Sequence, residues 1–230
     1  MPVVGLNAVI DLYHGDDVSD WSKAKASGIL AVIHKATEGT TVKDKFYPAR
    51  KVAAKASGLL WGSFHYSSGE DPVRQADHYL DYAQPDADEV VCLDLEHSSQ
   101  PANGPHVPDM TYAQALAFVT RVQQRLKRLP MVYGSDLLKT IMSGHAGSLL
   151  NQCPLWLAEY PKPQYTEPQQ GLPDGWKQWT LWQYAADGNG PQPHDVPGIG
   201  RCDRDTFSGS LDEFNQQWPF TRTATPTPAV

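Results

Sequence analysis

The chain has 230 residues, of which 40% are hydrophobic and 20% are charged, as is typical of a globular protein. Its net charge of -7 argues against a nucleic-acid-binding surface and against attraction to anionic lipid. Residues 1–11 contain no basic segment followed by an apolar one, and no apolar run reaches membrane-spanning length. We therefore expect a soluble protein that is made in the cytoplasm without a classical signal peptide.

Apolar runs and helical spacing alternate along the chain. We expect helices over residues 21–27, 48–57, 72–82, 111–128, 136–143 and 211–218. We expect strands over residues 4–12, 29–35, 59–66, 90–96, 129–133, 155–160, 179–185 and 199–207. Alternation in the first half predicts parallel βαβ units, and eight strands in this length predict an α/β fold, an irregular TIM-like (β/α) barrel whose later helices are reduced or missing. Residues 1–218 would form this single domain, and the Thr- and Pro-rich residues 219–230 a disordered tail.

The strand expected at residues 90–96 ends in two acids. Successive strand side chains point to opposite faces, so Asp94 and Glu96 share one face, about 6.6 Å apart along the chain. Each carboxylate disfavours ionisation of the other, so one of the two pKa values should rise and that group could hold a proton at neutral pH. Glycoside hydrolases use a protonated carboxylic acid beside an ionised one. Two acids can also lie in solvent at an ordinary strand end.

Polar side chains recur where the expected strands end, and active sites of β/α barrels lie at the carboxyl ends of the strands. Together these residues predict an acidic, aromatic-lined mouth: Asp11, Lys35, His65, Tyr66, Asp94, Glu96, Tyr133, Glu159, Tyr160, Gln183 and Asp203.

Neither the cysteines nor the histidines predict a metal centre. Cys92, Cys153 and Cys202 lie in or beside apolar runs, which favours buried free thiols. The eight His residues show no ligand spacing such as HxH or HExxH. We therefore expect no metal and no other cofactor.

Eight segments, taken in order, resemble glycoside hydrolase family 25, the lysozyme-like muramidases. They span residues 4 to about 214: Ile10-Asp11-Leu12, Lys35-Ala36-Thr37-Glu38-Gly39, Gly62-Ser63-Phe64-His65-Tyr66, Leu93-Asp94-Leu95-Glu96, Val132-Tyr133, Leu155-Trp156-Leu157-Ala158-Glu159-Tyr160, Trp182-Gln183-Tyr184 and Cys202-Asp203-Arg204-Asp205. The resemblance implies an irregular barrel that cleaves the β-1,4 bond between N-acetylmuramic acid and N-acetylglucosamine in peptidoglycan, with retention of configuration.

The resemblance also implies roles for single residues. Glu96 would be the general acid, and Asp94 would either orient the N-acetyl group of the substrate or act as the nucleophile itself, two routes that the sequence leaves open. Asp11 and Asp203 would tune charge and position water or substrate. The implied sugar contacts are Tyr66, Tyr133, Trp156, Tyr160, Gln183 and Lys35.

The chain departs from the family pattern at three positions. Tyr13 and Asp16 lie where, or near where, the family often has Ser and Gln, and Cys202 replaces a small aliphatic residue. The first two could reshape a substrate subsite. Three other functions stay open: a chitinase-like hydrolase, whose motif has a further Asp where this chain has Cys92, a non-catalytic glycan-binding barrel, and a metal-dependent deacetylase or amidohydrolase.

The resemblance sets the expected partners. The substrate would be bacterial peptidoglycan in the cell wall, in the periplasm or outside the cell, and neither nucleic acid nor membrane would be bound. A phage-type lysin released by a holin and a toxin delivered by a secretion machine, with an immunity protein, both fit a chain without a signal peptide. We expect a monomer.

Overall fold

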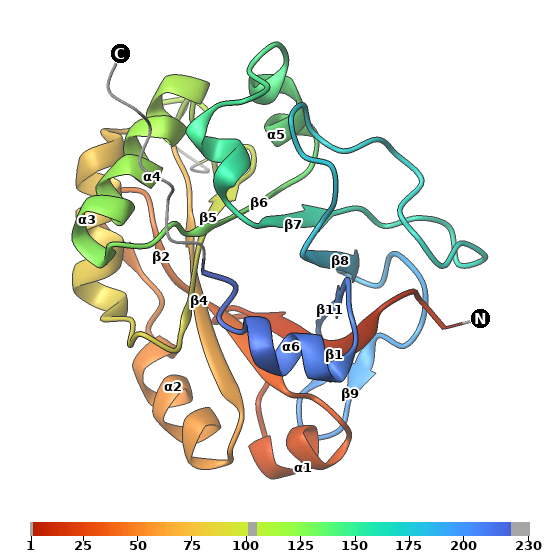
Figure 1. The fold of residues 1–230 in the computed structure, drawn as a ribbon. Coiled ribbons are helices and arrows are strands. Elements are labelled where there is room, and N and C mark those ends of the chain that lie inside the picture. The colour runs from red at the N-terminus through yellow and green to blue at the C-terminus, as the bar shows by residue number, and fades with distance from the viewer. Residues whose placement is uncertain (1, 101–104, 222–230) are drawn as a thin grey trace.

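Eight strands close into a barrel in the computed structural model, which describes residues 2–100 and 105–221 (Figure 1). Pairing of the first strand with the second closes the ring. In their order around the barrel, the strands are β1 (Leu6–Leu12), β11 (Asp203–Phe207), β8 (Leu181–Ala185), β7 (Leu155–Ala158), β6 (Met131–Gly134), β5 (Val90–Leu95), β4 (Leu60–Tyr66) and β2 (Ala31–Glu38). The prediction of an irregular barrel is confirmed.

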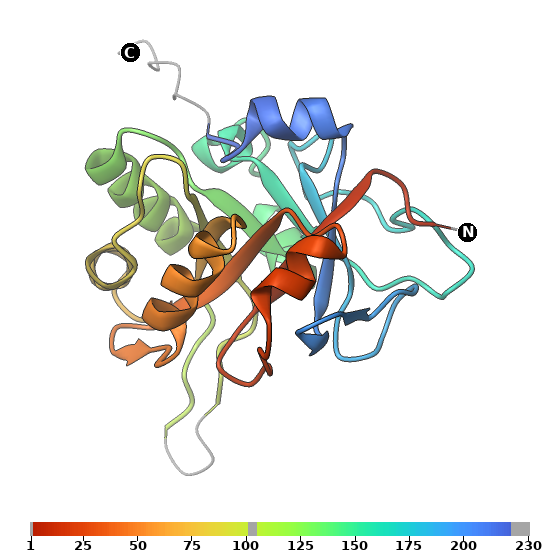
Figure 2. The ribbon, with the colours of Figure 1, turned by 90° about the horizontal axis from the view of Figure 1, so that it is seen from below.

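Helices cover the barrel unevenly. The helices are α1 (Trp21–Ala26), α2 (Tyr47–Ala56), α3 (Pro72–Ala83), α4 (Tyr112–Leu126), α5 (Asp136–Met142), the 3-10 turn η1 (Leu149–Gln152) and α6 (Leu211–Gln217). In both ribbon views α2, α3 and α4 lie over the side formed by β2, β4 and β5, whereas long loops border β7 and β8 (Figures 1 and 2). The later connections, from β7 to β8 and from β8 to β11, lie wholly within the described residues and contain no helix, as eight strands in a chain of this length predicted.

The longest helix shows why the sequence forms these elements. Thr111 accepts a hydrogen bond from the backbone N–H of Gln114, and the Gln114 side chain accepts one from the backbone N–H of Thr111, which caps α4. Ala115, Phe118 and Val122 recur at helical spacing and are fully buried. The face that the sequence predicted as apolar is therefore the face that packs on the barrel.

Strand β11 runs antiparallel to both of its neighbours, β1 and β8, while the other six neighbouring pairs in the barrel are parallel. Asp203 therefore begins β11, rather than ending a strand, and the reversed direction still places it opposite Asp11, near the carboxyl end of β1. The sequence predicted one longer strand over residues 199–207, but a separate short strand, β10 (Gly200–Arg201), pairs with β9 (Asp195–Val196) just before β11.

Strand β2 is longer than predicted. We expected it to end at Lys35, but it continues through Thr37 to Glu38, because these residues pair with β3 (Val42–Lys43) in a hairpin that the sequence analysis missed. Expected and observed bounds of the other barrel strands on the parallel side differ by at most a few residues at either end.

The strands separate two packed layers. Along β5, Val90 and Cys92 point into the barrel, whereas Val91, Leu93 and Leu95 point outward against the helices. All three cysteines are buried, as predicted, and Cys92 and Cys202 are free thiols. The apolar residues inside the barrel end below Asp94, so the acids at the top of the strand lie above a layer of buried apolar side chains.

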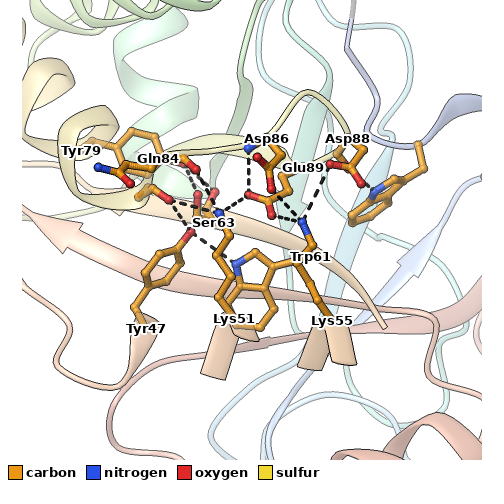
Figure 3. Close-up of polar contacts among 12 residues, drawn as sticks. Tyr47, Lys51, Lys55, Trp61, Ser63, Tyr79, Gln84, Asp86, Asp88 and Glu89 are labelled. Atoms are coloured by element: carbon orange, nitrogen blue, oxygen red, sulfur yellow. Dashed lines mark hydrogen bonds and ion pairs between the residues drawn. The ribbon is translucent and has the colours of Figure 1, made fainter. Parts of the chain in front are cut away.

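An ion-pair cluster joins α2 to the start of β5 at the opposite end of the barrel (Figure 3). Glu89 is 1% exposed, and its two oxygens accept hydrogen bonds from Lys51 Nζ at 2.7 Å and Lys55 Nζ at 2.6 Å. Its Oε2 atom also accepts one from the backbone N–H of Asp86. The cluster fixes the helix to the strand that carries Asp94.

The described chain stays packed beyond residue 218. Phe220 is 5% exposed and stacks on Phe207, although it follows the boundary that the sequence analysis placed at 218. Residues 222–230, the rest of the predicted tail, lie outside the described residues. Among the described residues, no helix has the length and apolar character needed to cross a membrane.

Candidate active site

A cavity of about 220 Å³ opens at the mouth of the barrel. It brings together nine of the ten residues to which the family resemblance gave catalytic or sugar-contact roles: Asp11, Lys35, Tyr66, Asp94, Glu96, Tyr133, Trp156, Gln183 and Asp203. The tenth, Tyr160, lies beside it, with its hydroxyl oxygen 3.4 Å from that of Tyr133. His65 and Glu159, which were also predicted at the mouth, do not line the cavity, because His65 packs on Phe118 of α4 and Glu159 binds the backbone at Gln169 and Gln170. Four residues outside the predicted set also line the cavity: Leu12, Tyr13, Asp16 and Phe64.

Strand β5 presents Asp94 and Glu96 to this cavity. Asp94 is 4% exposed, and Glu96, one residue beyond the strand, is partly exposed. Burial raises the pKa of Asp94 well above its ordinary value, and the neighbouring Glu96 raises it further. Burial also raises the pKa of Glu96. The strand therefore holds two carboxyl groups that cannot both ionise freely, as their alternate positions predicted.

Lys35 is the cation that faces this acid pair. Its charge lowers the pKa of Asp94, and so opposes the effect of burial. Its Nζ atom lies 2.5 Å from Glu38 Oε2 and 4.6 Å from the centre of the Tyr66 ring. Asp94 Oδ1 is buried and has no hydrogen-bond partner among the described residues. A buried carboxylate oxygen that accepts no hydrogen bond is poorly stabilised as an anion, which agrees with the raised pKa of Asp94.

Gln183 links the two acids of the opposite wall. Asp11 and Asp203 face one another across β1 and β11, and the side-chain nitrogen of Gln183 donates to Asp11 Oδ2 at 2.7 Å and to Asp203 Oδ2 at 3.3 Å. Burial raises the pKa of Asp11 well above its ordinary value and, together with the Asp11 carboxyl, raises that of Asp203 to about 9. These acids are poorly solvated, and a full set of negative charges is strongly disfavoured.

The predicted sugar-contact residues differ in what they can offer. Tyr66 and Tyr160 keep part of their surface in water, and the Tyr66 hydroxyl donates to the backbone carbonyl of His97. Trp156 is 1% exposed, and its ring nitrogen donates inward to Asp205 at 2.6 Å. Trp156 therefore forms the floor of the cavity, whereas the two tyrosines form its rim.

Asp205 also belongs to the site, although no role was predicted for it from the sequence. It is fully buried, and its Oδ2 atom has no donor among the described residues apart from the adjacent Asp11 carboxyl, which lies within hydrogen-bonding reach. Burial raises its pKa to about 8. Alternation along the last strand could have found it, because Asp205 lies two positions after Asp203 and therefore points to the same face.

One group of three acids among the described residues is close enough to share a cation, and it lies away from the cavity. It consists of Asp86, Asp88 and Glu89, and the ammonium group of Lys55 lies within 4.0 Å of a carboxylate oxygen of each (Figure 3). A lysine thus occupies the position that a metal would need, and we assign no metal function to these acids.

The fold and the cavity together define a class of protein. A closed β/α barrel with buried carboxyl groups and aromatic rings at the carboxyl ends of its parallel strands has the layout of a glycoside hydrolase. The family model of glycosyl hydrolases family 25 matches residues 10–192, and the chain belongs to that family. The resemblance read from the ordered segments is confirmed, and the chain is a glycoside hydrolase.

Relatives and solved structures agree with this assignment. The chain is 26% identical to Lysozyme M1 of Streptomyces globisporus over 212 residues, which cover 87% of this chain and 67% of that protein. The structure of a bacterial lysozyme from Streptomyces coelicolor superposes with a TM-score of 0.77 at 26% identity, covering 96% of this chain and 99% of the other. A family 25 lysozyme from Aspergillus fumigatus gives 0.72 at 27% identity, covering 91% and 97%.

Proposed function

We propose that the chain is a muramidase that hydrolyses peptidoglycan at the β-1,4 bond between N-acetylmuramic acid and N-acetylglucosamine. Its membership of family 25 and its likeness to lysozymes support the substrate class. The observation that carries the chemistry is the pairing of buried Asp94 with partly exposed Glu96 at one end of β5, both facing a single cavity.

In this proposal Glu96 is the general acid. Burial raises the pKa of Glu96, so the side chain keeps its proton at a higher pH than a free Glu would. It gives this proton to the glycosidic oxygen as the bond to the anomeric carbon breaks. Its place at the rim lets it reach a leaving group that departs toward solvent.

Asp94 stabilises the positive charge that develops on the sugar. It is ionised when it acts, helped by the nearby charge of Lys35, and it lines the cavity. It either orients the N-acetyl group of the substrate for attack or attacks the anomeric carbon itself, and both routes retain configuration. Asp11 and Asp203 tune the charge of the site, and Tyr66, Tyr133, Trp156, Tyr160, Gln183 and Lys35 form the proposed sugar-binding surface.

Analysis of the cleavage products tests the bond that is cut. Purified protein is incubated with purified peptidoglycan, and new reducing ends are labelled with borohydride. We expect the label on muramic acid, without added metal and in the presence of EDTA. Label on glucosamine alone would assign the chain to a different bond specificity, and inhibition by EDTA would assign it to a metal-dependent class.

A pH profile tests the general acid. Glu96→Gln keeps the shape of the side chain but has no transferable proton, so we expect turnover to fall by roughly 10²–10⁴-fold. In the wild type the descending limb of kcat should lie above the ordinary Glu pKa of about 4.3, because the folded protein raises that pKa. A folded Glu96→Gln protein with wild-type turnover would contradict the assignment.

A chitinase-like hydrolase or a non-catalytic glycan-binding barrel are the alternative functions, and hydrolysis of chitin in preference to peptidoglycan, or binding without cleavage, would favour them. We further propose that residues 1–218 act as one catalytic domain and as a monomer, and that the protein acts on the cell wall, outside the cytoplasmic membrane. Delivery by a holin or by a secretion machine, with or without an immunity protein, is compatible with this function.

A further inference from the structure

The hydrogen-bond network behind Glu96 has a definite direction. It begins at Gln183, whose side chain is 2% exposed and lies between the acidic wall of the cavity and two tyrosine hydroxyls. The amide nitrogen of Gln183 can only donate, and its oxygen can only accept. The nitrogen lies 2.7 Å from Asp11 Oδ2 and 3.3 Å from Asp203 Oδ2, and the oxygen faces the two tyrosine hydroxyl groups.

The single hydrogen of the Tyr133 hydroxyl has two acceptors within reach. Gln183 Oε1 lies 2.7 Å from Tyr133 Oη, whereas Glu96 Oε1 lies 3.5 Å from it. The shorter contact has the ordinary length of an O–H···O hydrogen bond, and the longer one does not. The hydrogen therefore goes to Gln183, and the Tyr133 oxygen turns a lone pair toward Glu96.

A lone pair has opposite effects on the two states of Glu96. It repels a carboxylate oxygen, but it can accept the hydrogen of a neutral carboxylic acid. The Tyr160 hydroxyl does not reverse this arrangement, because it too donates to Gln183 Oε1. The network thus favours the form of Glu96 that carries a proton.

We propose that Gln183 is a positioning residue: by holding the hydroxyl hydrogen of Tyr133, it prevents Tyr133 from donating to Glu96 and so keeps the general acid protonated. This inference rests on the proposed role of Glu96. It gives Gln183 and Tyr133 a task apart from sugar contact, and it explains why a glutamine is buried between two acids and two tyrosines.

Several other charged or titratable groups also face Glu96. They come from several elements around the mouth: Lys35 on β2, Tyr66 on β4, Asp94 on β5, His97 after β5, Tyr160 after β7 and Asp187 after β8. Of these groups, Tyr160 has its hydroxyl 3.4 Å from that of Tyr133. Separate variants that lack the Tyr133 and the Tyr160 hydroxyls therefore distinguish these influences from that of the network.

The test compares pH profiles of kcat on purified peptidoglycan for the wild type and Gln183→Met. Methionine is similar in size to glutamine but has no strong acceptor, so it frees the Tyr133 hydrogen to donate to the Glu96 carboxylate. A donor lowers the pKa of the carboxyl group that accepts from it, and we expect the descending limb to move down by about one pH unit. Melting curves verify the fold, and Gln183→Leu replaces Gln183→Met if the latter is unstable.

The double variant Tyr133→Phe, Gln183→Met is the decisive control. Its descending limb should lie at the same pH as that of Tyr133→Phe alone, because neither variant has a hydroxyl group at position 133 that could donate to Glu96. Tyr160→Phe removes the other donor to Gln183 and should leave the limb in place. An unshifted limb in Gln183→Met, or an equal shift with Phe at position 133, would overturn the proposal. A wrong assignment of the general acid gives a different result: the descending limb of the pH profile would then still be present in Glu96→Gln.

Discussion

The ring nitrogen of Trp156 donates to Oδ1 of Asp205 at 2.6 Å in the closed interior of the barrel. This bond leaves the second oxygen of Asp205 beside the Asp11 carboxyl, with no other donor among the described residues. Two buried carboxyl groups in contact are most stable when they hold one proton between them. The site therefore contains a buried acid pair, one member of which, Asp11, also lines the cavity.

The first prediction concerns the pH dependence of stability. The pKa of Asp205 is about 8 in the folded protein and about 3.9 when unfolded, so between these values the folded state holds a proton that the unfolded state releases. The free energy of unfolding contributed by this group therefore falls as pH rises from about 4 to 8. Asp205→Asn keeps an acceptor for Trp156 and should lose less melting temperature between pH 5 and pH 8 than the wild type.

Asp212→Asn is the matched control for this prediction, because Asp212 is an exposed acid on α6, outside the cavity. Calorimetry at both pH values should give the wild-type difference for this variant. A difference of the same size in Asp205→Asn would mean that Asp205 is not protonated in the folded state.

The second prediction ranks the acids of the cavity. Asp94→Asn removes the negative charge that faces the cationic transition state, so turnover should fall at least as much as in Glu96→Gln, by roughly 10²–10⁴-fold. Asp203→Asn should cost less, because this carboxyl tunes its neighbours and has a pKa of about 9. Melting curves accompany each turnover assay, and loss of activity together with a collapse of the melting temperature would assign these acids to folding and not to catalysis.

The third prediction concerns Lys35, whose charge lowers the pKa of Asp94. Lys35→Met removes that charge, so the pKa of Asp94 rises, and a higher pH is needed before Asp94 ionises. The ascending limb of the activity profile should therefore move to higher pH, with the largest loss of kcat on the acid side. Lys162→Met, at an exposed lysine after β7, should leave this limb where it is. If the pH profile of activity were the same in both variants, Lys35 would have no influence on the pKa of Asp94.

The fourth prediction separates stability from catalysis. Glu89→Gln at the foot of the barrel replaces the charge that receives Lys51 and Lys55 (Figure 3). We expect a loss of up to about 3 kcal/mol in the free energy of unfolding. This is the low end of the range for breaking a buried ion pair, because the two lysines are partly exposed to water. Urea unfolding measures this loss. Turnover well below the melting temperature should be unchanged, and a large fall in kcat in the folded variant would refute the separation.

Much of the site was predictable from local patterns. Asp94 and Glu96 were found because alternation along one apolar strand puts both acids on one face, and Lys35 and Tyr133 because they lie near the ends of strands. These signals depend on residues that are close in sequence. They locate side chains at the mouth of a barrel without giving their partners.

The rest of the site depends on strand direction and on long-range contacts. Asp203 starts an antiparallel strand and reaches the mouth from its other end, which no local pattern reveals. Gln183 meets Asp11 across 172 positions of sequence, and the burial of Asp205 follows from closure of the barrel around Trp156. The proposal for Gln183 depends on which atom donates in each hydrogen bond. That direction can be assigned only when the positions of all the bonded groups are known.

Because β11 is antiparallel to β8, the connection between these two strands does not have to run along the length of the barrel. Strand β8 ends at the mouth and β11 begins there, so residues 186–202 leave and return at the same rim, whereas the segment between β5 and β6 must travel back along the whole barrel. Asp187, in this connection, already influences the pKa values of Glu96 and Asp203. Doubling such a loop costs only about 0.6 kcal/mol in closure entropy. Insertions here would change the rim beside the cavity while every strand of the barrel keeps its register.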